Sequence, residues 1–117
     1  MSYPKLTSTV TVTIAAAGNL SAAVDLSAVA VVGIVMPAAW DAANLTFAGS
    51  ETQAGTYTNV YDDAGTEYPV TAAASRRILV PPADLLGGCW LKVRSGTAAV
   101  PVNQAAERVL TLLVRPV

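Results

Sequence analysis

Short stretches in which apolar and polar residues alternate run through most of the chain and predict β-strands. In residues 7–14, three aliphatic side chains alternate with threonines. A period of two indicates a strand with one buried face, and β-branched residues on both faces disfavour a helix. Residues 29–36 are the most continuously apolar run and predict a central strand, which Pro37 ends.

Two further strands are expected near the C-terminus, at residues 89–95 and 108–115, joined by a connection that contains Gly, Ala and Pro. The first alternates between apolar and polar residues, as a half-buried strand does. The second is more continuously apolar, which indicates a strand covered on both faces. We expect the two to form a pair that joins a larger sheet.

Shorter strands and turn signals fill the rest of the chain. We expect strands at residues 20–26, 45–47, 56–61, 67–71 and 78–80, turns at 18–19 and 62–65, and short helical turns at 37–43, with Trp40 folded over the core, and at 83–87. Strands spaced by roughly 8–12 residues are typical of a sandwich or barrel. The sequence therefore predicts an all-β antiparallel β-sandwich of about eight strands, with residues 1–6 as an N-terminal arm and residues 7–117 as one domain.

Composition adds an expectation about the surface. Hydrophobic residues make up 53% of the 117 residues and charged residues only 13%, well below the roughly 25% usual for globular chains. So few charges indicate that part of the surface is covered by further copies or by a partner. The alternative is a well-packed Ala- and Thr-rich sandwich that has no partner. The net charge of −1 and the scattered basic residues argue against nucleic-acid binding.

Nothing in the sequence predicts a membrane segment or a signal peptide. Residues 29–36 are far shorter than the roughly 20 residues of a spanning helix, and the N-terminal residues alternate where a signal peptide would be continuously apolar. The single cysteine, Cys89, cannot form an internal disulfide. We expect its side chain to be buried and to pack as a small hydrophobic group. A chain without disulfides suits a reducing cytoplasm.

The candidate chemistry consists mostly of residues that are missing. The absence of histidine excludes Ser-His-Asp and Cys-His catalysis and, with a single cysteine, a structural zinc site. No phosphate-binding glycine loop or EF-hand loop occurs. We therefore expect no catalytic residues, no metal and no cofactor. The acidic residues near the turn at 62–65 are expected to stabilise the turn itself. A Ca²⁺ site in the loop and a catalytic role are the alternatives.

Aromatic residues offer a different kind of site. Sugar-binding candidates are Trp40, Tyr57, Tyr61 and Tyr68. Exposure of Trp40 or Tyr57 would favour a carbohydrate- or receptor-binding module, whereas Tyr57 and Tyr61 on one strand face more often pack against a neighbouring element.

Two segments carry a resemblance to a known class of proteins. They are IVMPAAWDAANLTFAGSETQAGTYTNVYDDAG (residues 34–65) and LKVRSGTAAVPVNQAAERVLTLLVRP (residues 91–116), and within them the pieces MPAAW…LTF and RSGT…PVNQ…R…TL. With them, residues 33–114 resemble small virion structural proteins of tailed bacteriophages and prophages. The resemblance implies a jelly-roll-like sandwich without enzymatic activity, carried in many copies.

The role that the resemblance favours is head decoration or cement. Such proteins, commonly trimers, lie on the particle exterior over junctions between major capsid proteins, after assembly in the host cytoplasm. The expected partners are thus the major capsid protein and further copies of the chain. A tail or fibre component and a carbohydrate- or receptor-binding module are the alternatives.

Contact with a partner is expected from the arm and from two loops. The residues are Ser2, Tyr3, Pro4, Lys5 and Leu6 of the arm, Glu51, Thr52 and Gln53 of the loop at 49–55, and Arg94, Asn103 and Gln104 around the connection at 95–104. Loops carry binding residues disproportionately. For the last segment an equal alternative is structural: a tight bend in which the two amides hydrogen-bond backbone groups.

Overall fold

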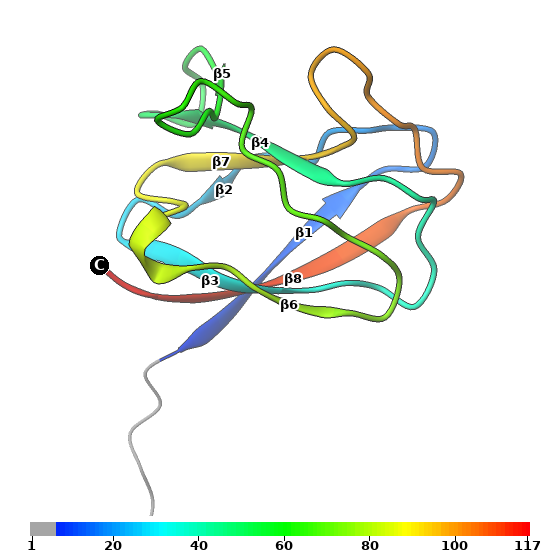
Figure 1. The fold of residues 1–117 in the computed structure, drawn as a ribbon, viewed down its shortest axis with the longest axis horizontal. Coiled ribbons are helices and arrows are strands. Elements are labelled where there is room, and N and C mark those ends of the chain that lie inside the picture. The colour runs from blue at the N-terminus through cyan, green and yellow to red at the C-terminus, as the bar shows by residue number, and fades with distance from the viewer. Residues whose placement is uncertain (1–6) are drawn as a thin grey trace, which may run out of the picture.

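The computed structural model describes residues 7–117 and arranges them in two antiparallel sheets packed face to face (Figure 1). The eight strands are β1 (Ser8–Ile14), β2 (Val24–Asp25), β3 (Val29–Val35), β4 (Leu45–Ser50), β5 (Thr58–Asn59), β6 (Arg77–Leu79), β7 (Trp90–Ser95) and β8 (Arg108–Pro116). One 3₁₀ helix, η1 (Pro82–Asp84), precedes β7. The prediction of an all-β antiparallel sandwich is confirmed.

The strand order is that of a jelly roll. The first sheet has the order β1-β8-β3-β6 and the second β2-β7-β4-β5. The first strand pairs with the eighth, the second with the seventh, the third with the sixth and the fourth with the fifth. Such nested pairs arise when one long antiparallel ribbon folds over into two sheets.

The expected pairing of the two C-terminal strands is wrong. β7 lies in the second sheet and β8 in the first, between β1 and β3. In a jelly roll, consecutive strands lie in opposite sheets except at the innermost β4–β5 pair. The connection at residues 96–107 therefore crosses from one sheet to the other.

β8 is also not covered on both faces. Leu110, Leu112 and Val114 are buried, whereas Leu113 is half-buried and Val109 is 44% exposed. The continuous apolar run thus places aliphatic side chains on the outer face of the first sheet as well as in the core.

Among the other predicted elements, β1 and β3 are confirmed almost residue for residue, and β4 extends to Ser50, beyond the expected 45–47. The strands expected at 20–26, 56–61 and 67–71 are shorter than predicted. The strand expected at 20–26 forms a ladder only at Val24–Asp25, and the strand expected at 56–61 only at Thr58–Asn59. Residues 67–71 contribute only the isolated bridges of Glu67 with Tyr61 and of Val70 with Leu45. Residues 37–43 contain no helical turn. The helical turn expected at 83–87 is replaced by the shorter and earlier η1 at Pro82–Asp84.

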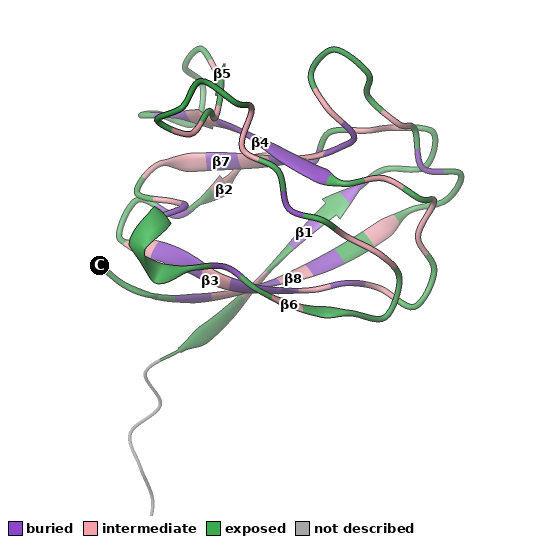
Figure 2. Ribbon diagram, viewed as in Figure 1, coloured by how far each residue is buried: buried purple, intermediate pink, exposed green. Residues whose placement is uncertain are grey.

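The core fills the space between the sheets (Figure 2). Alternate residues of each strand point inward, so that β1 supplies Val12 and Ile14 while β4 supplies Leu45 and Phe47. Trp40 is half-buried and packs against this core, as expected. A buried side chain such as that of Phe47 stabilises the fold by about 1.5–3 kcal/mol.

Candidate functional site

The residues expected to contact a partner do not form one surface. Ser2, Tyr3, Pro4, Lys5 and Leu6 lie outside the described residues. Glu51, Thr52 and Gln53 are exposed in the connection after β4, and the other three belong to β7 and the connection before β8. Figure 1 places these two connections at opposite ends of the sandwich.

Gln104 is a structural residue, because its side chain is completely buried. Its Oε1 accepts hydrogen bonds from the backbone N–H of Asp41 at 2.8 Å and from Nε of Arg108 at 3.2 Å. Its Nε2 donates to the Asp41 carbonyl at 3.0 Å and to Ser95 Oγ at 2.8 Å. The expectation of a partner contact is wrong for this residue, and the structural alternative describes it better.

Asp41, whose side chain is 40% exposed, completes this cluster at the end of the sandwich. Its carboxylate lies 3.3 Å from the Arg108 guanidinium and accepts a hydrogen bond from the Ala105 N–H at 2.6 Å. The cluster therefore fastens the segment before β4 to the segment before β8.

Arg94 is held in a second cluster, on the outer face of the second sheet. It lies 3.2 Å from the Glu67 carboxylate, and the two side chains are only 11% and 16% exposed. It also donates to Asn59 Oδ1 at 2.9 Å, and Glu67 accepts the Ala98 N–H at 3.1 Å. These bonds occupy the guanidinium. Arg94 had been expected to contact a partner, but its guanidinium is bound within the same chain. Asn103 alone of the three is exposed, and it accepts a hydrogen bond from Asn19 at 2.8 Å.

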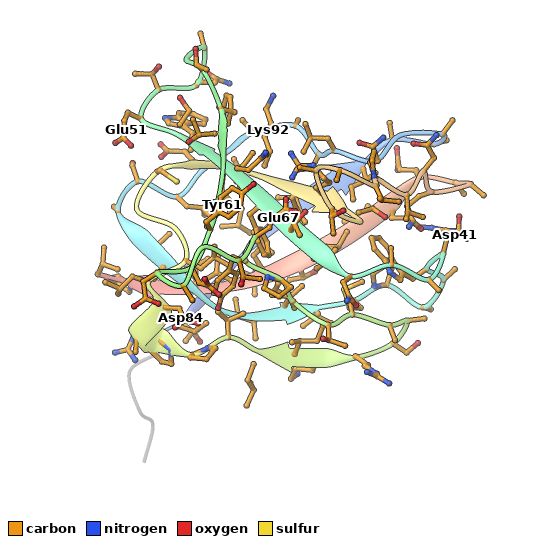
Figure 3. All side chains as sticks on the ribbon, turned by 45° about the horizontal axis from the view of Figure 1, so that its top comes forward. Asp41, Glu51, Tyr61, Glu67, Asp84 and Lys92 are labelled. Atoms are coloured by element: carbon orange, nitrogen blue, oxygen red, sulfur yellow. The ribbon has the colours of Figure 1, made fainter. Side chains whose placement is uncertain are left out.

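The opposite end of the sandwich holds a pocket of about 400 Å³. It lies between the turn after β5, η1 and the entry to β7, and its lining includes Tyr61, Asp62, Asp63, Tyr68, Asp84 and Cys89. Figure 3 shows Tyr61 and Asp84 from two separate segments at this end. A volume of this size suits a small ligand or part of a larger one.

The polar groups of the pocket are partly engaged with each other. The Tyr68 hydroxyl donates a hydrogen bond to the Asp84 carboxylate. Burial, together with this bond and the negative charge of Asp84, raises the pKa of Tyr68 to about 12. Asp62 Oδ1 accepts the N–H groups of Ala64 and Thr66, at 3.0 and 2.9 Å, and so serves the turn as predicted. Asp63 is exposed.

Cys89 lines the pocket as a half-buried thiol. Burial, followed by the negative charge of Glu51, raises its pKa, while a hydrogen bond with the Ser50 backbone lowers it. The protonated thiol is a weak nucleophile. Cys89 is half-buried at the pocket wall, whereas the sequence had predicted a buried side chain.

The candidate carboxylates divide between the pocket and two ion pairs outside it. Asp41 and Glu67 each form an ion pair in a separate cluster, whereas Asp62, Asp63 and Asp84 line the pocket. Within residues 7–117, no group of three or more His, Cys, Asp or Glu side chains could hold a metal ion.

The aromatic residues whose exposure would favour a sugar site are half-buried. The Trp40 Nε1–H donates to the Ala43 carbonyl at 3.0 Å. The Lys92 ammonium lies 4.3 Å from the centre of the Tyr57 ring, whose hydroxyl donates to the Gln53 carbonyl at 2.8 Å. Tyr61, at 56% exposed, is the aromatic ring that the pocket offers to solvent.

Sequence reasoning missed an apolar surface near the C-terminus. Leu79, Leu85 and Val117 are 79%, 64% and 70% exposed. The last two line a groove of about 410 Å³ whose other walls are Ala30, Val32, Pro82, Arg115 and Pro116. We call Leu79, Leu85, Val117 and this groove the apolar surface. The excess of apolar residues over charges was the signal in the sequence, but it did not give the position.

No protein-family model, curated protein or solved structure matches this chain. Among the described residues, no helix is long and apolar enough to cross a membrane.

Proposed function

We propose that the protein is a non-enzymatic virion structural protein of a tailed phage or prophage, and that it binds the capsid as a head decoration or cement protein. The observation that carries the proposal is the apolar surface. Large exposed apolar side chains beside a groove are typical of a protein–protein contact, and the low proportion of charged residues had predicted such a contact.

Two further points support this role. The jelly roll occurs in viral capsid domains, although a fold by itself does not determine a function. The resemblance of residues 33–114 to virion structural proteins gives the fold a context. It also implies self-association, with the trimer as the expected form, and a place on the particle exterior after assembly in the host cytoplasm.

Cementing requires contact and no chemical step. A protein that binds the assembled lattice better than free subunits stabilises the lattice by mass action. Many weak contacts on one particle add up through multivalency. A sandwich that presents the apolar surface is sufficient for this task.

The test is co-sedimentation of the purified chain with expanded heads that lack it. We expect saturable binding at a fixed ratio to the major capsid protein, and weaker binding for Leu85→Ser and Val117→Ser. Val100→Ser is a matched control, because Val100 is 69% exposed but lies in the connection at the other end of the sandwich. Failure to bind heads, with binding to tails instead, would replace this proposal by a tail or fibre role.

The pocket supports a second candidate, a carbohydrate-binding function. Tyr61 offers an exposed ring for stacking, and the Asp63 and Asp84 carboxylates could accept hydrogen bonds from sugar hydroxyls. Glycan-array binding that Tyr61→Ala abolishes, and that Leu85→Ser leaves intact, would favour this function. No glycan binding at all would remove it.

A further inference from the structure

The edges of the two sheets are not protected equally. β1 and β6 are the edges of the first sheet, and β2 and β5 those of the second. An edge strand presents a row of unpaired N–H and C=O groups to any other extended chain. Proteins usually block such edges with short strands, charges, prolines or bulges.

Three of the four edges carry these devices. β6 has three residues, includes Arg77 and is followed by two prolines. β2 has two residues, one of which is Asp25. β5 also has only two residues. Each of these edges offers too short a ladder for a partner strand.

β1 carries none of them. It has seven residues, STVTVTI, without a charge or a proline. Its register with β8 is unbroken from Ser8 to Ile14, so no bulge twists it away. Among the described residues, only β8 forms backbone hydrogen bonds with residues 8–14.

We propose that β1 is a self-association interface, in which two copies pair their β1 strands antiparallel about a two-fold axis through Thr11. The two first sheets then continue each other as one sheet of eight strands, four from each copy. An interface of this kind is isologous and closes on itself as a dimer.

The side chains of β1 match themselves in this register. Thr9 faces Thr13 of the second copy and Thr11 faces Thr11, so the exposed threonines meet on the outer face. Thr–Thr pairs across antiparallel strands are favourable. On the inner face, half-buried Val10 meets Val12 of the second copy, which extends the apolar layer across the axis.

A second β1 strand is a better occupant of this edge than another part of a second copy. Pairing of β1 with β2, β5 or β6 would offer two or three residues of ladder. A trimer through this edge would need such an unequal pairing, so the edge favours a dimer over the trimer that the resemblance implies.

The first test measures self-association of the purified full chain by sedimentation velocity over a concentration series. We expect a reversible dimer. Thr11→Lys places two like charges opposite each other on the axis and should weaken association by about ten-fold. Thr58→Lys adds the same charge to β5, an edge of the second sheet, and should leave association unchanged. Both sites are exposed, and circular dichroism checks that each variant folds.

The second test fixes the register by disulfide cross-linking in a Cys89→Ser background. Cβ atoms of directly opposite residues lie about 4.5–5.5 Å apart, close to disulfide distance, so Thr11→Cys should cross-link to itself. Thr9→Cys should not, because its own counterpart lies about 13 Å along the strand. A mixture of Thr9→Cys and Thr13→Cys chains should cross-link.

A chain that stays monomeric at all concentrations would overturn the proposal. So would association that Leu79→Lys disrupts and Thr11→Lys does not, since that result would move the interface to the apolar surface. The assays use the purified chain without capsids. A chain that does not self-associate through β1 can therefore still bind heads. A chain that does not bind heads can still form the β1 dimer.

Discussion

The outer faces of the two sheets differ in how their side chains are satisfied. On the second sheet, Thr46 is almost completely buried; its hydroxyl donates to the Gly96 carbonyl at 2.7 Å and lies 3.3 Å from the Arg94 guanidinium. On the first sheet, Thr9, Thr11 and Thr13 are exposed to solvent. Threonines thus form hydrogen bonds within the chain on the outer face of the second sheet, whereas on the first sheet they are exposed to solvent.

This difference separates structural polar residues from available ones. The charges of the second sheet are paired with groups of the same chain, so they have little left to offer a partner. The first sheet presents hydroxyls, the aliphatic side chains of β8 and, among residues 7–117, an edge of β1 without a backbone partner. We therefore expect substitutions on the second face to reduce stability, and substitutions on the first to change association.

The largest effect is expected for Gly96→Ala, at the bend that receives the Thr46 hydroxyl. Gly96 has φ +90°, and an added Cβ would lie 2.6 Å from the Val100 carbonyl oxygen and 2.7 Å from the Val102 nitrogen. Backbone strain and overlap together should lower the free energy of unfolding by about 2–4 kcal/mol. Urea unfolding followed by tryptophan fluorescence measures it.

Gly65→Ala is the matched control for this variant. Gly65 has φ +85° but nothing within 4 Å of the added Cβ, so only the conformational cost of about 1 kcal/mol remains. Equal losses for the two variants would show that contacts at Gly96 do not hold the bend.

Gln104→Leu should follow, with a loss of about 2–3 kcal/mol. The change removes the partners of the Asp41 backbone groups and of Ser95 in a buried site, and unsatisfied buried groups are costly. Asn103→Ala, one residue earlier and exposed, should cost less than about 0.5 kcal/mol. Thermal or urea unfolding compares them, and a neutral Gln104→Leu would contradict the assigned role.

Arg94→Met tests the comparison of the two faces directly. It removes the half-buried pair with Glu67 and should cost about 1–2 kcal/mol. Thr13→Val, on the exposed face, should change stability by less than about 0.5 kcal/mol. Both variants are measured by urea unfolding at dilutions where the chain is monomeric. Equal losses of unfolding free energy would mean that the two faces do not differ as described.

The last effect is expected at Tyr68, and it is confined to alkaline solution. Because the folded protein raises the pKa of Tyr68 from 10.0 to about 12, the unfolded chain loses this proton first as pH rises. Stability therefore falls between about pH 10 and pH 12. The urea midpoint, measured across that pH range, should fall less for Tyr68→Phe than for the original chain. If the midpoints of both chains fell equally, Tyr68 would not be the titrating group.

Local alternation predicted what depends on neighbouring residues. The burial of Val12 and Ile14 followed from side chains that point to opposite faces of a strand. The position of β3 followed from its continuously apolar run. Alternation does not encode which strand lies beside which, so the placement of β7 and β8 in different sheets could not be predicted from it.

The same limit explains the candidate sites. Gln104 follows the exposed Asn103 in a polar-looking loop, and its partners Asp41 and Ser95 are brought to it only by the fold. The pocket likewise joins Tyr68 to Asp84 across two segments with no shared motif. By contrast, the turn role of Asp62 was predictable, because its partners lie within four residues.

The place of β8 in the first sheet has a consequence for how the chain folds. Both β1 and β3 pair with β8, so neither has its main partner until residues 108–116 have been synthesised. Contacts between the two ends of a chain are slow to form, and folding should take milliseconds to seconds. A nascent chain arrested before β8 would hold the β-prone segment of β1 without its neighbour, exposed to pairing with other chains until β8 has been made.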